Sequence, residues 1–339
     1  MHEEKANWQR FRSHQQLTVA QANQLIEVCA LTHKGAALAG KTIAQLELLP
    51  GGLVNTNYRV HFNATDWSVV LRLYVRDAQA CAKEAALLRL VGKTVPVPEV
   101  LHMEPKGLEG FPPFAILEYV EGVIFRNLRR TKEQPAIAQA AASIGAALAA
   151  IANRRFTKRG FFNADLEVGN WLLDGTDTIP RLIDLCLDSE SLTTRVGSAF
   201  VESVHQFALN WAERLSSVDA ETQLVHADFN ASNIIVRFIK GSWRVAAVID
   251  WEYSFSGSPL WDVGNVLRYE RQARPLVEPH FSRACIEAGL ELPDDWRRLA
   301  RAVDLCSLCE ILSRPSLPAD VVEEVVELVK ATVEDRDPE

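Results

Sequence analysis

Three oxygen-bearing side chains lie at the open end of a predicted β-hairpin. The string LVHADFNASNIIV places Asp228 five residues before Asn233, and Asp250 follows the apolar run AAVI. The stretches 233–238 and 243–250 read as antiparallel strands joined by a Lys-Gly turn, so their open ends should be neighbours. Carboxylate and amide oxygens suit Mg²⁺ with bound phosphate. The pattern indicates phosphoryl transfer. In this reading Asn233 and Asp250 bind the metal, and Asp228 receives the proton of the acceptor hydroxyl or orients that hydroxyl. The alternative is a turn in which these side chains only cap backbone donors.

A buried cation and a helix carboxylate lie upstream in the order that such chemistry needs. Arg72 is in the middle of the predicted strand WSVVLRLYV, and Glu84 follows on the predicted helix 78–91. A strand cation paired with a helix carboxylate grips nucleotide phosphates in kinases. The segment GGLVNTN (51–57), which contains Asn55, is expected to turn tightly over phosphates. The alternatives are a peripheral ion pair and an ordinary hairpin loop.

The elements that position these residues divide the chain into a β-rich first third and a mainly helical remainder. Before Gly122, the patterns predict a helix at 18–31, a strand, loop and strand within 49–62, strands at 67–75 and 114–120, and a helix at 78–91. After Gly122, they predict helices at 136–152, 194–215, 294–312 and 320–333 around the embedded hairpin. The predicted fold class is therefore α+β in two lobes, residues 1–121 with a helical extension at 1–45, and residues 122–339.

Composition excludes several function classes. The chain has 339 residues, 48% of them hydrophobic, which excludes a disordered protein. A net charge of −8 argues against a nucleic-acid partner, which needs clustered Lys and Arg. The longest near-apolar run, 140–152, is too short to span a bilayer, and the first ten residues are polar, so we expect no membrane partner and a cytoplasmic location. The six cysteines are scattered, and the pair Cys306 and Cys309 reads as helical thiols.

A rival phosphate-binding motif lies near the N-terminus. Residues 35–42 (GAALAGKT) match GxxxxGK[ST]. Such a loop should follow a strand and open a long helix, whereas here a helix is predicted before it and only TIAQLELL follows before Pro50. We interpret Gly35 as a helix stop and Lys41 as solvent-exposed.

The chain resembles the aminoglycoside phosphotransferase and choline kinase family, small-molecule kinases with a bilobal protein-kinase-like fold. The resemblance extends from about residue 49 to residue 268. It rests on HADFNASN (226–233) as the catalytic loop, VIDWEYSFSGSPLWDVGNVLR (248–268) as the metal-binding segment, and VPVPEV with FAILEYVEG as the passage to the hinge. Three departures stand out: Arg72 replaces the commoner lysine, the first loop lacks the GxGxxG of protein kinases, and Trp251-Glu252 follows Asp250 in place of Phe-Gly, as is usual in this family.

The resemblance implies a role for each matching residue. Asp228 is the catalytic carboxylate, and Asn233 and Asp250 bind Mg²⁺. Arg72 contacts the phosphates of ATP or GTP, and Glu84 holds Arg72. Backbone groups from Glu118 to Val120 meet the base, Asp262 steadies the catalytic loop, and His226 is structural.

The acceptor is predicted to be a small, cationic hydroxyl compound. Residues 165–190 carry seven acidic side chains and one basic one, which would attract an aminoglycoside or another amino alcohol. The alternative is a solvated acidic surface. The function expected is Mg²⁺-dependent transfer of the γ-phosphate of ATP to this acceptor, and the alternative is a catalytically silent kinase-like module that binds a nucleotide or metabolite. The oligomeric state stays open.

Overall fold

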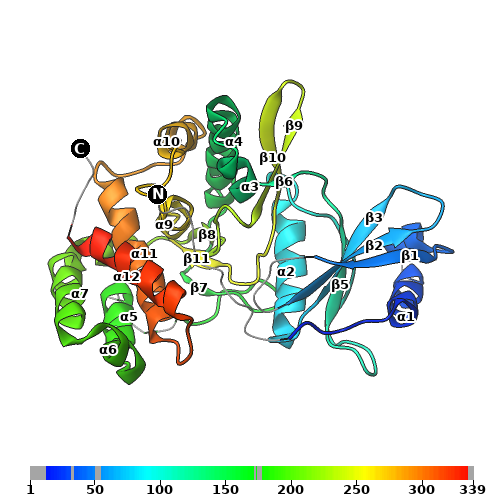
Figure 1. The fold of residues 1–339 in the computed structure, drawn as a ribbon, viewed down its shortest axis with the longest axis horizontal. Coiled ribbons are helices and arrows are strands. Elements are labelled where there is room, and N and C mark those ends of the chain that lie inside the picture. Colours follow the sequence, from blue (N-terminus) through cyan, green and yellow to red (C-terminus); the bar gives the residue numbers. More distant parts are fainter. Residues whose placement is uncertain (1–12, 32–33, 50–54, 172, 174–177, 335–339) are drawn as a thin grey trace.

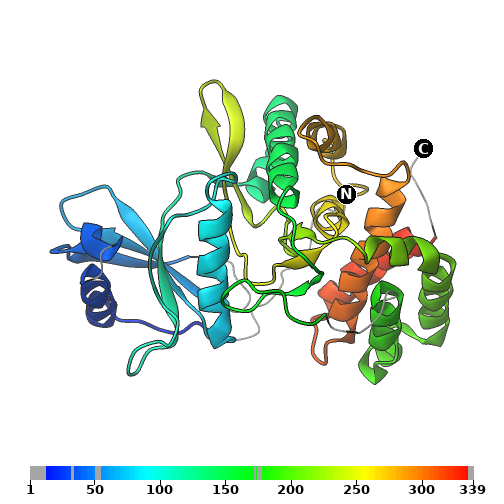
Figure 2. The same ribbon diagram turned by 180° about the vertical axis from the view of Figure 1, so that it is seen from behind.

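The computed structural model describes residues 13–31, 34–49, 55–171, 173 and 178–334. Figures 1 and 2 show a sheet-rich part on one side and a helical part on the other, with the helix α2 standing between the sheet and the helical part. The N-terminal residues form the sheet-rich part, and the chain then stays in the helical part to its end. This arrangement matches the predicted α+β architecture.

The N-terminal part is built on a five-stranded antiparallel sheet with the order β1-β2-β3-β5-β4. Its strands are β1 (Ile43–Leu48), β2 (Thr56–Phe62), β3 (Ser68–Leu73), β4 (Val100–Glu104) and β5 (Phe114–Glu118). Buried and partly buried side chains alternate strictly along β2, so one face of the sheet is closed by a core and the other is more open.

Two different helices cover the two faces of this sheet. The helix α1 (Val19–Ala30) and the short 3₁₀ helix η1 (Lys34–Leu38) close the outer face, where Leu25 and Ile26 share a core with Val60 and Leu71. The helix α2 (Ala78–Val91) packs against β4 and β5 on the inner face. The inner face over β2 and β3 carries Arg72, which contacts Asp250 of the helical part.

Ten helices, counted within the described residues, build the C-terminal part around one core that also includes the inner side of the sheet. They are α3 (Phe125–Arg130), α4 (Gln134–Ala152), α5 (Thr178–Leu187), α6 (Glu190–Val196), α7 (Ser198–Asn210), α8 (Ala212–Val218), α9 (Leu260–Leu267), α10 (Glu278–Glu287), α11 (Trp296–Ser313) and α12 (Ala319–Val333). Cys306 and Cys309 lie buried in α11, as predicted.

The helix α4 is the longest apolar element and is longer than the predicted apolar run. By length and composition α4 alone among the described residues would cross a membrane, but 61% of its apolar window is buried inside the protein. It packs against α10, and at Gly145 an added Cβ would lie 2.2 Å from the carbonyl oxygen of Phe281. The helix is therefore a core element whose glycine allows close approach to α10.

Two small sheets of three strands place the loops that carry polar residues. The sheet β10-β9-β6 contains the predicted hairpin, with β9 (Ile234–Ile239), β10 (Ser242–Val248) and the short strand β6 (Val123–Ile124). The sheet β7-β11-β8 consists of β7 (Gly160–Phe161), β8 (Gln223–Val225) and β11 (Phe255–Gly257). The loop 226–233 therefore runs between the two sheets, and the segment 249–254 returns from one to the other.

Some predicted elements were wrong. The first strand is 43–48, not part of 49–62, so the predicted helical extension to residue 45 overlaps a strand. The single helix predicted at 194–215 is divided among α6, α7 and α8. Gly197, with a positive φ of 80°, separates α6 from α7, and Trp211 separates α7 from α8.

The rival phosphate-binding motif lacks the required context. Two expectations about this motif were wrong. The helix α1 ends at Ala30, and Gly35 lies inside η1 and does not stop α1. Lys41 is partly buried and not solvent-exposed, with its ammonium 5.3 Å from the centre of the Trp67 ring. The segment then enters β1 and not a long helix, so it has no helix N-terminus to present to a phosphate.

Candidate active site

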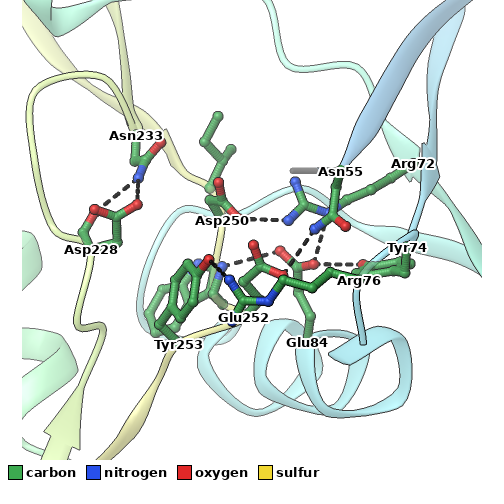
Figure 3. A network of polar contacts seen from close by, with 12 residues as sticks. Asn55, Arg72, Tyr74, Arg76, Glu84, Asp228, Asn233, Asp250, Glu252 and Tyr253 are labelled. Atoms are coloured by element: carbon green, nitrogen blue, oxygen red, sulfur yellow. Dashed lines mark hydrogen bonds and ion pairs between the residues drawn. The ribbon is translucent and has the colours of Figure 1, made fainter. Parts of the chain in front are cut away.

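The loop between β8 and β9 brings Asp228 and Asn233 into direct contact. The Asn233 Nδ2 donates to the Asp228 Oδ2 at 2.7 Å and to the Asp228 carbonyl oxygen at 3.0 Å (Figure 3). Asn230 Nδ2 donates to the other carboxylate oxygen, Oδ1, at 2.6 Å. Both oxygens of the Asp228 carboxylate are therefore oriented by amides of its own loop.

A buried carboxylate on α9 fixes the start of this loop. Asp262 accepts hydrogen bonds from the backbone N–H groups of His226, at 2.7 Å, and Ala227, at 2.8 Å. Ala227 has a positive φ of 70°, a conformation that costs free energy in a residue with a side chain. Asp262 offsets this cost, and its placement agrees with the predicted steadying role.

His226 joins the loop to the end of the hairpin. Its Nδ1 accepts from the Asp228 backbone N–H at 3.1 Å, and its Nε2 lies 3.1 Å from the Ile249 carbonyl oxygen, to which it donates. Burial lowers the pKa of His226 to about 4. The imidazole is therefore neutral at physiological pH, which suits the predicted structural role.

Asp250 ends the hairpin at the same place as Asn233 begins it. The Ile249 N–H donates to the Asn233 carbonyl oxygen at 2.9 Å, and Asp250 itself has a φ of 70°. Its Oδ1 lies 2.5 Å from Arg72 Nη2, which comes from β3 of the N-terminal sheet (Figure 3). The hairpin thus brings Asn233 and Asp250 together, and Asp250 also reaches the opposite lobe.

The predicted pair of Arg72 and Glu84 is formed. Arg72 Nε lies 2.9 Å from the Oε2 of Glu84, which also accepts from the Tyr74 hydroxyl at 2.5 Å. The Oε1 of Glu84 accepts from the Trp251 backbone N–H at 3.1 Å. The Glu84 carboxylate is almost fully buried and connects α2, β3 and the segment that follows Asp250.

Two more contacts that sequence reasoning missed cross between the lobes. Asn55 Nδ2 donates to Glu252 Oε2 at 2.9 Å, and Arg76 Nη1 donates to the Tyr253 hydroxyl at 2.8 Å. Asn55 therefore lies beside Glu252, two residues after Asp250 in the chain, while residues 51–54 of the same predicted loop lie outside the described residues. The sequence could have indicated Glu252 as a residue of this site through its position two residues after Asp250.

Carboxylates outnumber cations at the centre of this network. Burial, and secondly the charge of Asp250, raise the pKa of Asp228 to about 6 and that of Glu252 to about 7. Burial also raises the pKa of Glu84, which Arg72 opposes. Arg72 is in direct contact with Asp250 and Glu84 of this group. Burial alone would lower the pKa of Arg72, but the charges of Asp250 and Glu84 outweigh this effect and raise the pKa well above its usual range.

The donor set of the hairpin fits Mg²⁺. Among the described residues, no three His, Cys, Asp or Glu side chains are grouped as a metal site. The predicted site needs only the Asp250 carboxylate and the Asn233 amide oxygen, which points away from Asp228 because the amide nitrogen faces that carboxylate. Mg²⁺ is commonly held by one or two protein oxygens, with water and substrate phosphates completing its shell.

The predicted base contacts lie at the end of β5. The Glu118 N–H donates to the Glu99 carbonyl oxygen at 2.9 Å, and its carboxylate accepts from the Glu99 N–H at 3.2 Å. A base contact at this residue would therefore use the Glu118 carbonyl, and the backbone of Val120 follows two residues later. Arg59 of β2 reaches the same region, with its guanidinium 3.7 Å from the centre of the Tyr119 ring.

The acidic stretch of the predicted acceptor site is mostly on the surface. Asp184 contacts His205 at 2.8 Å, and Asp174 and Asp177 lie outside the described residues. The remaining acidic side chains of this stretch are exposed: Asp165, Glu167, Asp188 and Glu190.

Solved kinases share this fold. A thermostable mutant of aminoglycoside phosphotransferase APH(4)-Ia, in a ternary complex with AMP-PNP and hygromycin B, is 22% identical, with 90% of this chain and 98% of that chain covered and a TM-score of 0.65. The GDP complex of wild-type aminoglycoside 2'-phosphotransferase-IIIa is 14% identical, with coverage of 94% and 99% and a TM-score of 0.65. These matches confirm the predicted bilobal kinase-like fold.

Sequence comparison gives the family. A relative from Mus musculus, acyl-CoA dehydrogenase family member 10, is 26% identical over 280 residues, which are 74% of this chain and 24% of that protein. The chain spans about a quarter of the length of the curated relatives it matches. Residues 45–301 match the sequence model of the phosphotransferase enzyme family. That match covers well over half of the sequence, so the chain belongs to the phosphotransferase enzyme family.

Proposed function

We propose that this phosphotransferase moves the γ-phosphate of ATP to a hydroxyl group of a small molecule, with Mg²⁺, at the junction of the two lobes. The observation that carries the proposal is the meeting of Asp228, Asn233 and Asp250 at the open end of one hairpin, in contact with Arg72 and Glu84 of the other lobe. A turn that only capped its own backbone would have no need of a buried arginine from a distant strand.

Asp228 is the residue that we assign to the acceptor hydroxyl. Its carboxylate is oriented by the amides of Asn230 and Asn233, and a pKa of about 6 lies close enough to neutral pH for the group to accept a proton. The acceptor oxygen must approach this carboxylate in line with the phosphate, so the fixed orientation of Asp228 contributes mainly to positioning.

Asn233 and Asp250 would hold Mg²⁺, which when bound neutralises phosphate charge and orients the nucleotide. Arg72 supplies a second positive charge beside them, and its planar guanidinium suits phosphate oxygens. Glu84 holds the Arg72 side chain in place. The backbone of Glu118 and Val120 would receive the base.

For the acceptor we propose a cationic hydroxyl compound. The exposed acids of residues 165–190 favour it, and a structural neighbour is solved in a complex with hygromycin B. The same neighbour also holds AMP-PNP, and a second neighbour holds GDP, so ATP and GTP are both tested as donors.

The experiment is a panel of aminoglycosides, amino alcohols and neutral sugars incubated with γ-labelled ATP or GTP and Mg²⁺. We expect a labelled product from an amine-bearing hydroxyl compound, and none with the Asp228→Asn variant. The surface change Asp294→Asn, at an exposed position outside residues 165–190, serves as the matched control and should leave the product yield unchanged. Labelling of neutral sugars alone would contradict the cationic acceptor, and equal labelling by the Asp228→Asn variant would contradict the assigned site.

A further inference from the structure

The inner face of the N-terminal sheet has a phosphate end and a hinge end. Asn57 of β2 is paired with Arg72 of β3, beside Asp250. Two residues further along each strand, Arg59 is paired with Val70, on the same face because strand side chains alternate. Val70 is in turn paired with Leu117 of β5, next to the predicted base contact at Glu118. A nucleotide with its phosphates at Arg72 would therefore place its base under Arg59 and Val70.

Arg59 is held at this position by three partners. Its guanidinium carbon lies 3.7 Å from the centre of the Tyr119 ring, its Nε donates to the Ser68 hydroxyl at 3.1 Å, and its Nη2 lies 3.2 Å from Glu121 Oε1. Its side chain is 22% exposed, whereas that of Glu121 is 63% exposed. An exposed ion pair alone would contribute little, but the stacked ring and the second hydrogen bond fix the plane of the guanidinium.

This arrangement places a flat cation on the face of the sheet where the base is expected to lie. A guanidinium stacks on aromatic faces and donates hydrogen bonds along its edge, so it can bind a purine in ways that an aliphatic side chain cannot. Because three partners fix the Arg59 side chain, little conformational freedom remains for it to lose when a base binds.

We propose that Arg59 binds the purine base of the nucleotide at the hinge end of the site, with Tyr119 and Glu121 as positioning residues for its guanidinium. The inference rests on the proposed function and adds a residue to it that sequence reasoning did not single out. Arg59 lies away from Asp228 and Asp250, so it sets nucleotide affinity and not the rate of transfer.

The test measures binding of ADP and of GDP, each with Mg²⁺, by titration calorimetry without an acceptor. Arg59→Met keeps the length and removes the charge, and Arg59→Lys keeps the charge and removes the planar stack. We expect Arg59→Met to weaken ADP binding about five- to tenfold, the size of a partly desolvated cation–π contact. Arg59→Lys should weaken it by a smaller factor. Arg237→Met, at an exposed position on β9, is the control and should bind as the unmodified protein does.

Tyr119 gives a second pair of variants that leaves Arg59 itself in place. Tyr119→Phe keeps the ring and should bind ADP normally, whereas Tyr119→Leu removes the stack and should lose part of the affinity. In the transfer reaction, Arg59→Met should raise the KM for ATP and leave kcat within about twofold. Unchanged ADP affinity in both Arg59→Met and Tyr119→Leu would overturn the inference. If the unmodified protein bound neither nucleotide, the proposed function itself would be wrong, and this inference with it.

Discussion

Arg72 shows how a single side chain can serve two lobes. Its Nε contacts Glu84 on α2 and its Nη2 contacts Asp250 at the end of β10. A lysine has one side-chain nitrogen, so it could contact one of these carboxylates closely or both at longer distances. The arginine at this position, a departure from the family pattern, is therefore explained by the fork that the structure needs between two carboxylates.

Arg72→Lys tests this explanation. The charge is kept, but one of the two carboxylates, the buried Glu84 or the partly buried Asp250, loses its direct partner. We expect the free energy of unfolding to fall by about 1–3 kcal/mol, the cost of an unsatisfied buried acceptor, and Mg²⁺-dependent ADP affinity to fall with it. Urea unfolding and calorimetry measure the two quantities, and Arg237→Lys is the surface control. A variant as stable as the unmodified protein would show that the fork is not required.

His226 gives a prediction about pH. Its pKa is about 4 in the folded protein, whereas an unfolded histidine titrates near 6.5. Between pH 4 and pH 6.5 the unfolded state therefore binds more protons than the folded state. The contribution of His226 to the free energy of unfolding is fully present above pH 6.5 and is lost as the pH falls toward 4.

Between pH 7.5 and 5.5 this loss amounts to about 1 kcal/mol. Asp228, Glu252 and Asp262 have raised pKa values and oppose the trend, because their folded forms take up protons first. The measurement is therefore the difference in urea stability between the unmodified protein and His226→Gln at each pH. The advantage of the unmodified protein should shrink on acidification, and a constant difference would contradict the neutral, buried imidazole.

The hairpin and the helix α2 show what could be predicted at the scale of elements. Local periodicity was enough to predict α2 at its observed bounds and both hairpin strands, and with them the meeting of Asn233 and Asp250. The division of the helix at Gly197 depends on one positive φ angle, which the surrounding helical pattern concealed. The contacts of Asn55 with Glu252 and of Arg76 with Tyr253 join residues 197 and 177 positions apart, so they follow from lobe packing and not from any local pattern.

At the same scale, Gly145 tests the packing of α4 on α10. Alanine favours a helix over glycine by about 1 kcal/mol, but its Cβ would meet the Phe281 carbonyl oxygen at 2.2 Å. Overpacking of this kind costs about 1–3 kcal/mol, so we expect Gly145→Ala to be less stable in urea. Ala146→Ser, at the adjacent exposed position, is the control and should change little. A stabilised Gly145→Ala protein would show that the two helices can separate at no cost.

The residues that we assign to the reaction come from both lobes. The hairpin of the helical lobe supplies Asp228, Asn233 and Asp250, and the sheet lobe supplies Arg72, Glu84 and Asn55. The segment 250–253 is contacted by the sheet lobe at each of its four residues, through Arg72, Glu84, Asn55 and Arg76. The relative position of the lobes is thus set at the site itself.

The most direct measurement compares Asp228→Ala with Asp250→Ala in two assays, phosphoryl transfer to the acceptor found in the panel and Mg²⁺-dependent binding of ADP. Asp228→Ala should lose transfer by at least about a hundredfold, as expected for a positioned acid–base group, and still bind ADP. Asp250→Ala should lose both, because its carboxylate is assigned to the metal. Normal turnover by Asp228→Ala, or undiminished Mg²⁺-dependent binding by Asp250→Ala, would contradict the account.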